Sequence, residues 1–157
     1  MKRPRFLPDL FTERKIQLVD PSADIAGAYL KKSRSHLASA ILLENNEHYE
    51  EAVSLAYYSM YHAVMALFFR TGIKCENHSA AIILLKEVYQ IDNTPLSEAK
   101  RERIDMQYYI ETTATRKEVE DLISNAESFN AHILDFIERI PNEEIKRNRE
   151  RLKKLVE

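Results

Sequence analysis

The sequence predicts an all-α protein, and three observations support this prediction. Glycine occurs only twice in 157 residues, as Gly27 and Gly72, which is too few for the many tight turns of a sheet-rich fold. Apolar residues recur at spacings near 3.6 in successive segments. Residue types typical of helix starts precede most of these segments. The connections are short, which favours antiparallel neighbours and therefore a bundle of four or five helices.

The first helix is expected over residues 21–43. Asp20 suits the N-cap because its carboxylate accepts backbone N–H bonds, and Pro21 suits the first helical position because it has no N–H to satisfy. Residues 1–20 precede it as an irregular lead-in that contains two prolines among charged and aromatic residues.

The second helix is expected from about Tyr49 to Arg70. Gly72 follows it as a left-handed residue that ends the helix. Small side chains recur along this helix at i, i+4, i+7 and i+11, so that another helix can approach closely. We expect this ridge to pack against a partner helix or an identical subunit. The ridge consists of Ala52, Ala56, Ser59 and Ala63.

The third helix is expected to begin near Asn77 and to carry apolar residues as far as Tyr89. A fourth begins at Thr94, the expected cap, with Pro95 at its first position. This fourth helix is expected to extend through the adjacent tyrosines 108 and 109.

The fifth helix has the clearest apolar periodicity and is expected to end at Pro141. Its start is a capping box, in which Thr115 and Glu118 satisfy each other's backbone donors. A strongly charged helical tail follows over residues 142–157. The chain is thus divided into the lead-in, a helical bundle over residues 21–141 and this tail.

Composition narrows the functional classes. The formal net charge is −2, whereas a protein that binds nucleic acid over its whole surface is usually clearly basic. Glycine-rich phosphate loops are absent from the sequence, and its single cysteine, Cys75, cannot form an internal disulfide. No apolar run approaches the length of a membrane span, and the first residues lack the apolar core of a signal peptide. We expect a cytoplasmic protein without a membrane segment, a bound metal or another cofactor.

Arg70 and His78 flank the turn after the second helix and form the first candidate site. Metal-independent RNA cleavage needs groups that accept and donate protons near neutral pH, a role that suits histidine. It also needs a cation for the charge that grows on phosphorus, which a guanidinium can supply. Two symmetric subunits would provide two copies of each. The structural alternative stays open, because Arg70 complements the end of one helix and the residues around His78 cap the next.

Other residues near this turn are candidate substrate contacts. Lys74 and Asn77 are placed to steady a substrate, and His62 lies inside the second helix, one turn after Tyr58. Each of the last two has a structural alternative, as a hydrogen-bonded core histidine or a core tyrosine whose hydroxyl reaches the rim. The histidines are scattered and show no metal-ligand spacing, so no metal site is expected.

Three pieces of the sequence in combination resemble the HEPN domain, a small helical domain of prokaryotic toxin–antitoxin and defence systems. They are the "YYSMYHA" helix, the "G…K…NH" turn and the "RIDMQYYIETTATRKEVEDLISNAESFNAHI" segment. The resemblance covers about residues 25–140. It implies an up-and-down four-helix bundle with an additional short helix, commonly dimeric. It also implies frequent pairing with a minimal nucleotidyltransferase encoded alongside.

Many members of that family are metal-independent ribonucleases with an Arg-x(4–6)-His motif near the dimer interface. By this resemblance His78 corresponds to the family histidine and Arg70 is the nearest upstream arginine, but seven residues separate them. Lys74 is closer and is not an arginine. Some toxins also carry a tyrosine two residues after the histidine, where the partner enzyme nucleotidylates it, and Ala80 occupies that position here.

Two functional hypotheses follow. In the first, the chain is the ribonuclease toxin of a two-component system and binds or cleaves RNA at a dimer cleft through His78 and Arg70. In the second, the motif is degenerate and the chain is a non-catalytic module that binds a nucleotide or a protein.

Overall fold

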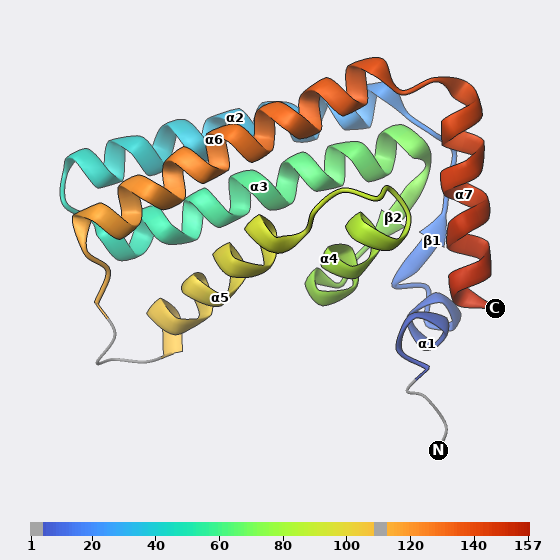
Figure 1. The fold of residues 1–157 in the computed structure, drawn as a ribbon, viewed down its shortest axis with the longest axis horizontal. Helices are drawn as coiled ribbons and strands as arrows, with labels where there is room; N and C mark the ends of the chain where they lie inside the picture. Colours follow the sequence, from blue (N-terminus) through green and yellow to red (C-terminus); the bar gives the residue numbers. More distant parts are fainter. Residues whose placement is uncertain (1–4, 109–112) are drawn as a thin grey trace.

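The computed structural model describes residues 5–108 and 113–157, most of them in helices (Figure 1). The elements in chain order are α1 (Phe6–Thr12), β1 (Ile16–Leu18), α2 (Ala23–Asn45), α3 (Tyr49–Thr71), β2 (Ile73–Cys75), α4 (His78–Glu87), α5 (Thr94–Tyr108), α6 (Arg116–Arg139) and α7 (Asn142–Val156). The long helices α2, α3 and α6 lie side by side with α5, and α4 is the additional short helix. The predicted all-α class is confirmed. Tyr109, expected in the fourth helix, lies outside the described residues.

Helix α3 runs through the middle of the bundle and is surrounded by α2, α5 and α6. Its residues are therefore apolar on almost every face rather than along one stripe. By length and composition alone this helix could cross a membrane, with a mean hydropathy of 1.3, so our statement that no apolar run approaches that length is wrong. However, 72% of the 18-residue stretch of α3 to which this hydropathy applies is buried inside the bundle, as in the core helix of a globular domain.

The small-residue ridge of α3 faces other helices of the same chain. Ala52, Ala56 and Ser59 are fully buried, and Ala63 is 1% exposed. The close approach that these residues permit is therefore made by α2 and α6, and the expectation of a second chain against this ridge is corrected. Polar contacts mark the crossing: the Ser33 hydroxyl of α2 donates to the Ser59 carbonyl at 2.6 Å, and Asn130 of α6 donates to the Ser59 hydroxyl at 3.2 Å.

The segment before α2 is more ordered than expected. Residues 6–12 form α1, and β1 pairs antiparallel with β2 in the register Ile16↔Cys75, Gln17↔Lys74 and Leu18↔Ile73. The described part of the expected irregular lead-in is thus a helix and a strand. Its alternating side chains had no visible partner in the sequence, because the pairing strand lies more than fifty residues away.

Helix α2 is capped by Ser22 and not by Asp20. The Ser22 hydroxyl accepts the N–H of Ile25 at 3.1 Å. The chain stays extended up to this point because the end of α3 holds it: the N–H of Val19 donates to the carbonyl of Gly72, and that of Ser22 donates to the carbonyl of Phe69. At the start of α6, Thr115 is the N-cap as predicted and accepts the N–H of Glu118.

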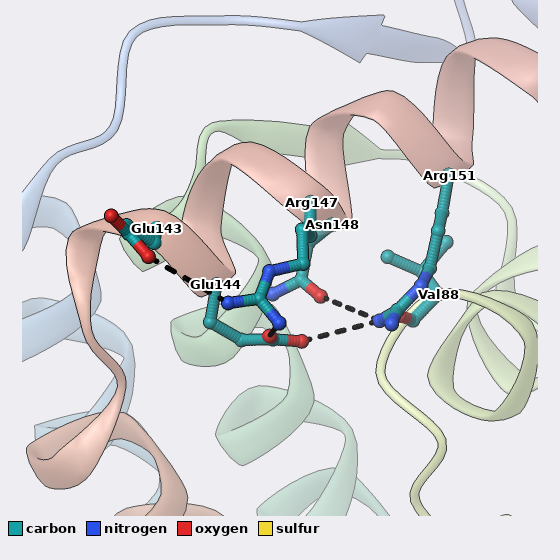
Figure 2. Close-up of polar contacts among 6 residues, drawn as sticks. All are labelled: Val88, Glu143, Glu144, Arg147, Asn148 and Arg151. Carbon is teal, nitrogen blue, oxygen red and sulfur yellow. Dashed lines mark hydrogen bonds and ion pairs between the residues drawn. The ribbon is translucent and has the colours of Figure 1, made fainter.

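Helix α7 packs across the end of the bundle, beside α1 and β1 (Figure 1). The charged helical tail expected over residues 142–157 is thus a helix that packs on the rest of the chain. Leu152 is fully buried. Arg151 donates to the carbonyl of Val88 at 2.9 Å and also contacts Glu144 and Asn148 of its own helix (Figure 2). The charged sequence concealed this docking because arginine stems pack against apolar surface while their guanidinium groups bond to carbonyls.

Candidate functional site

The chain between α3 and α4 brings His78 back along α3. Gly72 ends α3 in the left-handed conformation with φ +81°, as predicted. Strand β2 then runs away from this helix end, and three residues of strand span about 10 Å. Asn77 caps α4 by accepting the N–H of Ala80 at 2.9 Å, so that His78 is the first residue of the helix. As a result His78 lies against the middle of α3 and not at its end.

His78 is held by three tyrosines of α3. Its Nδ1 lies 2.6 Å from the hydroxyl of Tyr57. Its ring stacks on Tyr61 with 3.9 Å between centroids and 10° between planes, and the ring of Tyr58 meets it edge-on at 6.3 Å. Burial raises the pKa of the Tyr57 hydroxyl far above its usual value. That hydroxyl therefore keeps its proton, and it either donates to Nδ1 or accepts from an Nδ1 that carries the ring's proton.

Two cations from α5 stand beside His78. The guanidinium carbon of Arg103 lies 5.3 and 5.4 Å from the ring centroids of Tyr57 and Tyr58, within cation–π distance. The ammonium of Lys100 donates to the hydroxyl of Ser79 at 2.7 Å. Burial, together with Arg103 and Lys100, lowers the pKa of His78 below its ordinary value. The imidazole is therefore mainly neutral at pH 7 and able to accept a proton.

The structure does not bring Arg70 and His78 together. Arg70 lies in the last turn of α3, nine residues beyond the Tyr61 ring on which His78 stacks. Nine residues correspond to about 14 Å along the axis and, at 100° each, to the opposite face of the helix. The expected pair is therefore corrected: the arginine beside His78 is Arg103, from a different helix. Strand β2 causes the difference, because it separates the two residues where the sequence suggested a compact turn.

The other expected contacts divide between two places. Asn77 is occupied as the cap of α4, and Tyr58 lies half-buried beside His78 and Arg103. Lys74, on β2, lies 3.5 Å from Glu76 in an exposed ion pair. It also lines a cavity of about 240 Å³ next to His62 and the ring of Tyr29. Lys74 and His62 thus belong to a neighbouring part of the same face.

His62 is a half-buried ring in a group of aromatic side chains. It stacks with His36 of α2 at 4.8 Å and with Tyr29 at 5.8 Å between centroids. Burial, with smaller contributions from His36 and Lys32, lowers the pKa of His62 to about 4. Within residues 5–108 and 113–157, no three histidine, cysteine or acidic side chains gather as a metal site.

The sequence did not identify Arg103 and Lys100 as site residues, because they lie more than twenty positions after His78 on a separate helix. They lie three residues apart in α5, so both project from one face of that helix. This spacing of two basic residues was the signal in the sequence that α5 has a basic face. Which helix this face would contact could not be read from it.

Comparison with known proteins agrees with this arrangement of helices. The family model for the HEPN domain matches residues 26–140, which is most of the chain. The chain belongs to the HEPN domain family. The match spans α3, α4, α5 and α6 and nearly all of α2, and therefore includes His78, Lys100 and Arg103. Elements α1, β1 and α7 lie outside the matched residues.

The HEPN chain is also similar to the UPF0332 protein PH1297 of Pyrococcus horikoshii. The two are 41% identical over 54 residues, which is 34% of this chain and 38% of that protein. The similarity thus spans well under half of either chain.

Proposed function

We propose that this HEPN protein binds RNA at the His78 site and cleaves it without a metal ion. His78 would act as the acid or base, and Arg103 and Lys100 would hold the phosphodiester. The observation that supports this most strongly is the half-buried His78, fixed by the Tyr57 hydroxyl at 2.6 Å with two cations beside it. Arg103 takes the role that the sequence suggested for Arg70.

The chemistry requires two proton transfers. A base removes the proton of the ribose 2′-hydroxyl, the 2′-oxygen bonds to phosphorus, the bond from phosphorus to the 5′-oxygen breaks, and an acid protonates that leaving oxygen. A neutral His78 that donates from Nδ1 to the Tyr57 hydroxyl suits the first transfer, because Nε2 is then free to accept a proton at pH 7. The guanidinium of Arg103 would stabilise the negative charge that grows on the phosphoryl oxygens.

Each chain offers one histidine at this site, so the second proton transfer needs another group. A symmetric homodimer would bring a second His78 to the same cleft and so provide an acid opposite the base. In this proposal the protein is the toxin of a cytoplasmic two-component system whose antitoxin is a nucleotidyltransferase. Ala80 is fully buried where some toxins carry the modified tyrosine, so modification at that position is not part of the proposal.

The second candidate is a non-catalytic module that binds nucleotide or protein through the same residues. It is favoured by the absence of Arg70 from the neighbourhood of His78, since the arginine of the linear motif is then unavailable to a reacting phosphate. Binding needs only the cations and rings, whereas cleavage also needs both proton transfers.

A cleavage assay separates the two candidates. Wild type and the variants His78→Ala, Arg103→Ala and Lys100→Ala are incubated with total RNA and EDTA, and Arg70→Ala is the matched control. Cleavage that leaves 2′,3′-cyclic phosphate ends, is lost in His78→Ala and Arg103→Ala and is retained in Arg70→Ala would support the ribonuclease. If well-folded wild type leaves RNA intact, as a monomer and as a dimer, the cleavage proposal fails and the binding module is preferred.

A further inference from the structure

A row of half-buried aromatic side chains from α2 and α3 continues from His78, and the proposed reaction does not use it. We call this row the aromatic platform. It consists of Tyr29, His36, Tyr58, His62 and Phe69.

The rings of the aromatic platform form one connected series. Phe69 stacks on Tyr29 at 5.4 Å with 8° between planes, and Tyr29 stacks on His62 at 5.8 Å. His62 contacts both His36 at 4.8 Å and Tyr58 at 6.2 Å. Tyr58 meets His78 itself. From Tyr58 to Phe69 the platform extends eleven residues along α3, or about 16 Å.

A cavity lies beside the aromatic platform, and the ring of Tyr61, on which His78 stacks, forms one of its walls. Its volume is about 240 Å³, and its walls include the rings of Tyr29, Tyr61 and Phe69 with the side chain of Met65. Walls of this kind suit a flat apolar ring system, and the two lysines named below stand at its edge. The Nδ1 atom of His62 is buried among the described residues without a hydrogen-bond partner, and His62 also lines this cavity.

Cations flank the platform at both ends. Lys32 is exposed and its ammonium lies 5.7 Å from the ring centroid of Tyr29, and Lys74 stands across the cavity. Arg103 lies over Tyr58 at the other end. Glu76 is the acid at the cavity, where it pairs with Lys74 at 3.5 Å with both groups exposed. Phosphates entering here can compete for that lysine because exposed ion pairs are weak.

We infer that the aromatic platform binds an unpaired RNA strand, with one base in the cavity beside Tyr29 and Phe69 and the reacting phosphodiester at His78. The inference rests on the proposed function and names its substrate as single-stranded RNA several nucleotides long. Rows of aromatic rings edged by cations are how proteins hold single strands, because every base has a face that can stack. Double-stranded RNA keeps its bases stacked on one another and leaves none to enter the cavity.

The test measures binding apart from cleavage. Fluorescein-labelled 2′-O-methyl oligoribonucleotides cannot be cleaved by attack of a 2′-hydroxyl, and a dinucleotide reaches the His78 site alone whereas a decanucleotide also spans the platform. Anisotropy titrations compare both probes on wild type and on Tyr29→Ala, Phe69→Ala and Lys32→Ala. Tyr29→Leu keeps most of the buried bulk of this position if the alanine variant unfolds. Phe6→Ala on α1 and Lys146→Ala on α7 are matched controls at exposed positions elsewhere.

We expect wild type to bind the decanucleotide far more tightly than the dinucleotide. Tyr29→Ala and Phe69→Ala should weaken decanucleotide binding by about tenfold or more and leave dinucleotide binding unchanged, because one stacked base contributes on this scale. Lys32→Ala should reduce the slope of log K against log salt by roughly 0.7 for one lost phosphate contact. The controls should match wild type with both probes.

Two results would overturn the inference. The first is equal affinity of wild type and the platform variants for the decanucleotide. The second is a wild-type dimer that Tyr29→Ala or Phe69→Ala converts to monomer without a change in oligonucleotide affinity, which would assign the platform to contact between copies of this chain. Cleavage that fails while the length dependence holds refutes the ribonuclease alone. Cleavage without any length dependence refutes the platform alone.

Discussion

Replacing Gly72 with alanine tests how the turn after α3 positions the rest of the site. Gly72 has φ +81°, a region that costs an L-residue about 1 kcal/mol. An added Cβ atom would also collide with Nη1 of Arg149 and with the carbonyl oxygen of Val19. That same Nη1 donates to the carbonyls of Val19 and Gly72 at 2.8 Å and of Thr71 at 3.3 Å. The substitution therefore strains the backbone and expels the guanidinium from three carbonyls at once.

The expected loss of stability for Gly72→Ala is about 3 kcal/mol. Roughly 1 kcal/mol comes from the left-handed backbone. About 2 kcal/mol comes from the displaced Arg149, since hydrogen bonds to charged groups contribute on the order of 1.5–3 kcal/mol. In a domain of this size the total corresponds to a fall in Tm of roughly 6–12 °C. Gly27→Ala is the control, because nothing lies within 4 Å of its added Cβ in α2, and it should stabilise by about 0.5–1 kcal/mol.

Urea denaturation of wild type, Gly72→Ala, Arg149→Ala and the double variant forms a double-mutant cycle. If the two residues act together, alanine at position 72 should cost about 2 kcal/mol less once Arg149 is gone. Additive effects of the two substitutions would refute the reasoning, as would a Gly72→Ala protein within about 0.5 kcal/mol of wild type. Because β2 leads from this turn to His78, Gly72→Ala should also weaken the RNA binding that we propose at His78, in protein that remains folded.

Three further predictions concern groups whose partners the structure identifies. The pKa of His78, followed by NMR, should lie below its ordinary value of 6.5 and should rise in Arg103→Gln, and an unchanged pKa would remove Arg103 from the site. Because the pKa of His62 is lowered to about 4, the unfolded chain binds more protons than the folded one between pH 4 and 6.5. The free energy of unfolding should therefore decrease as the pH is lowered from 6.5 to 4, and it should decrease less in His62→Gln. Asn130→Ala leaves the buried Ser59 hydroxyl without its donor and should cost about 1 kcal/mol in thermal unfolding, and no change would show that this bond contributes nothing.

Much of the fold could be predicted because its signals are local. The cap at Thr115, the stop at Gly72 and the interruption at Pro141 each act within a few residues and were found. The cap of α2 was misplaced to Asp20 because the true boundary depends on hydrogen bonds from Val19 and Ser22 to the distant end of α3. Strand β1 and the docking of α7 were missed for the same reason, since their partners are remote in the sequence.

The candidate site was predicted only in part. His78 was identified because it stands at a helix start and because histidine transfers protons near neutral pH. The tyrosines of α3 that surround it were not predicted as its neighbours. Its arginine was misassigned because spacing along the chain measures proximity only where the chain is compact. The three residues of β2 move His78 away from Arg70 and toward α5, and nothing in the turn itself reports this displacement.

The position of Arg103 changes what the spacing of Arg70 and His78 means. A gap of seven residues would weaken a ribonuclease assignment if the two side chains had to meet within one turn. Here the cation comes from α5, twenty-five positions after His78, and its distance from the tyrosines is set by helix packing. The stretched linear motif therefore does not by itself exclude catalysis. What decides between cleavage and binding is whether a second proton-transferring group reaches the phosphate that Arg103 and Lys100 would hold. A dimer that pairs two His78 rings would supply such a group.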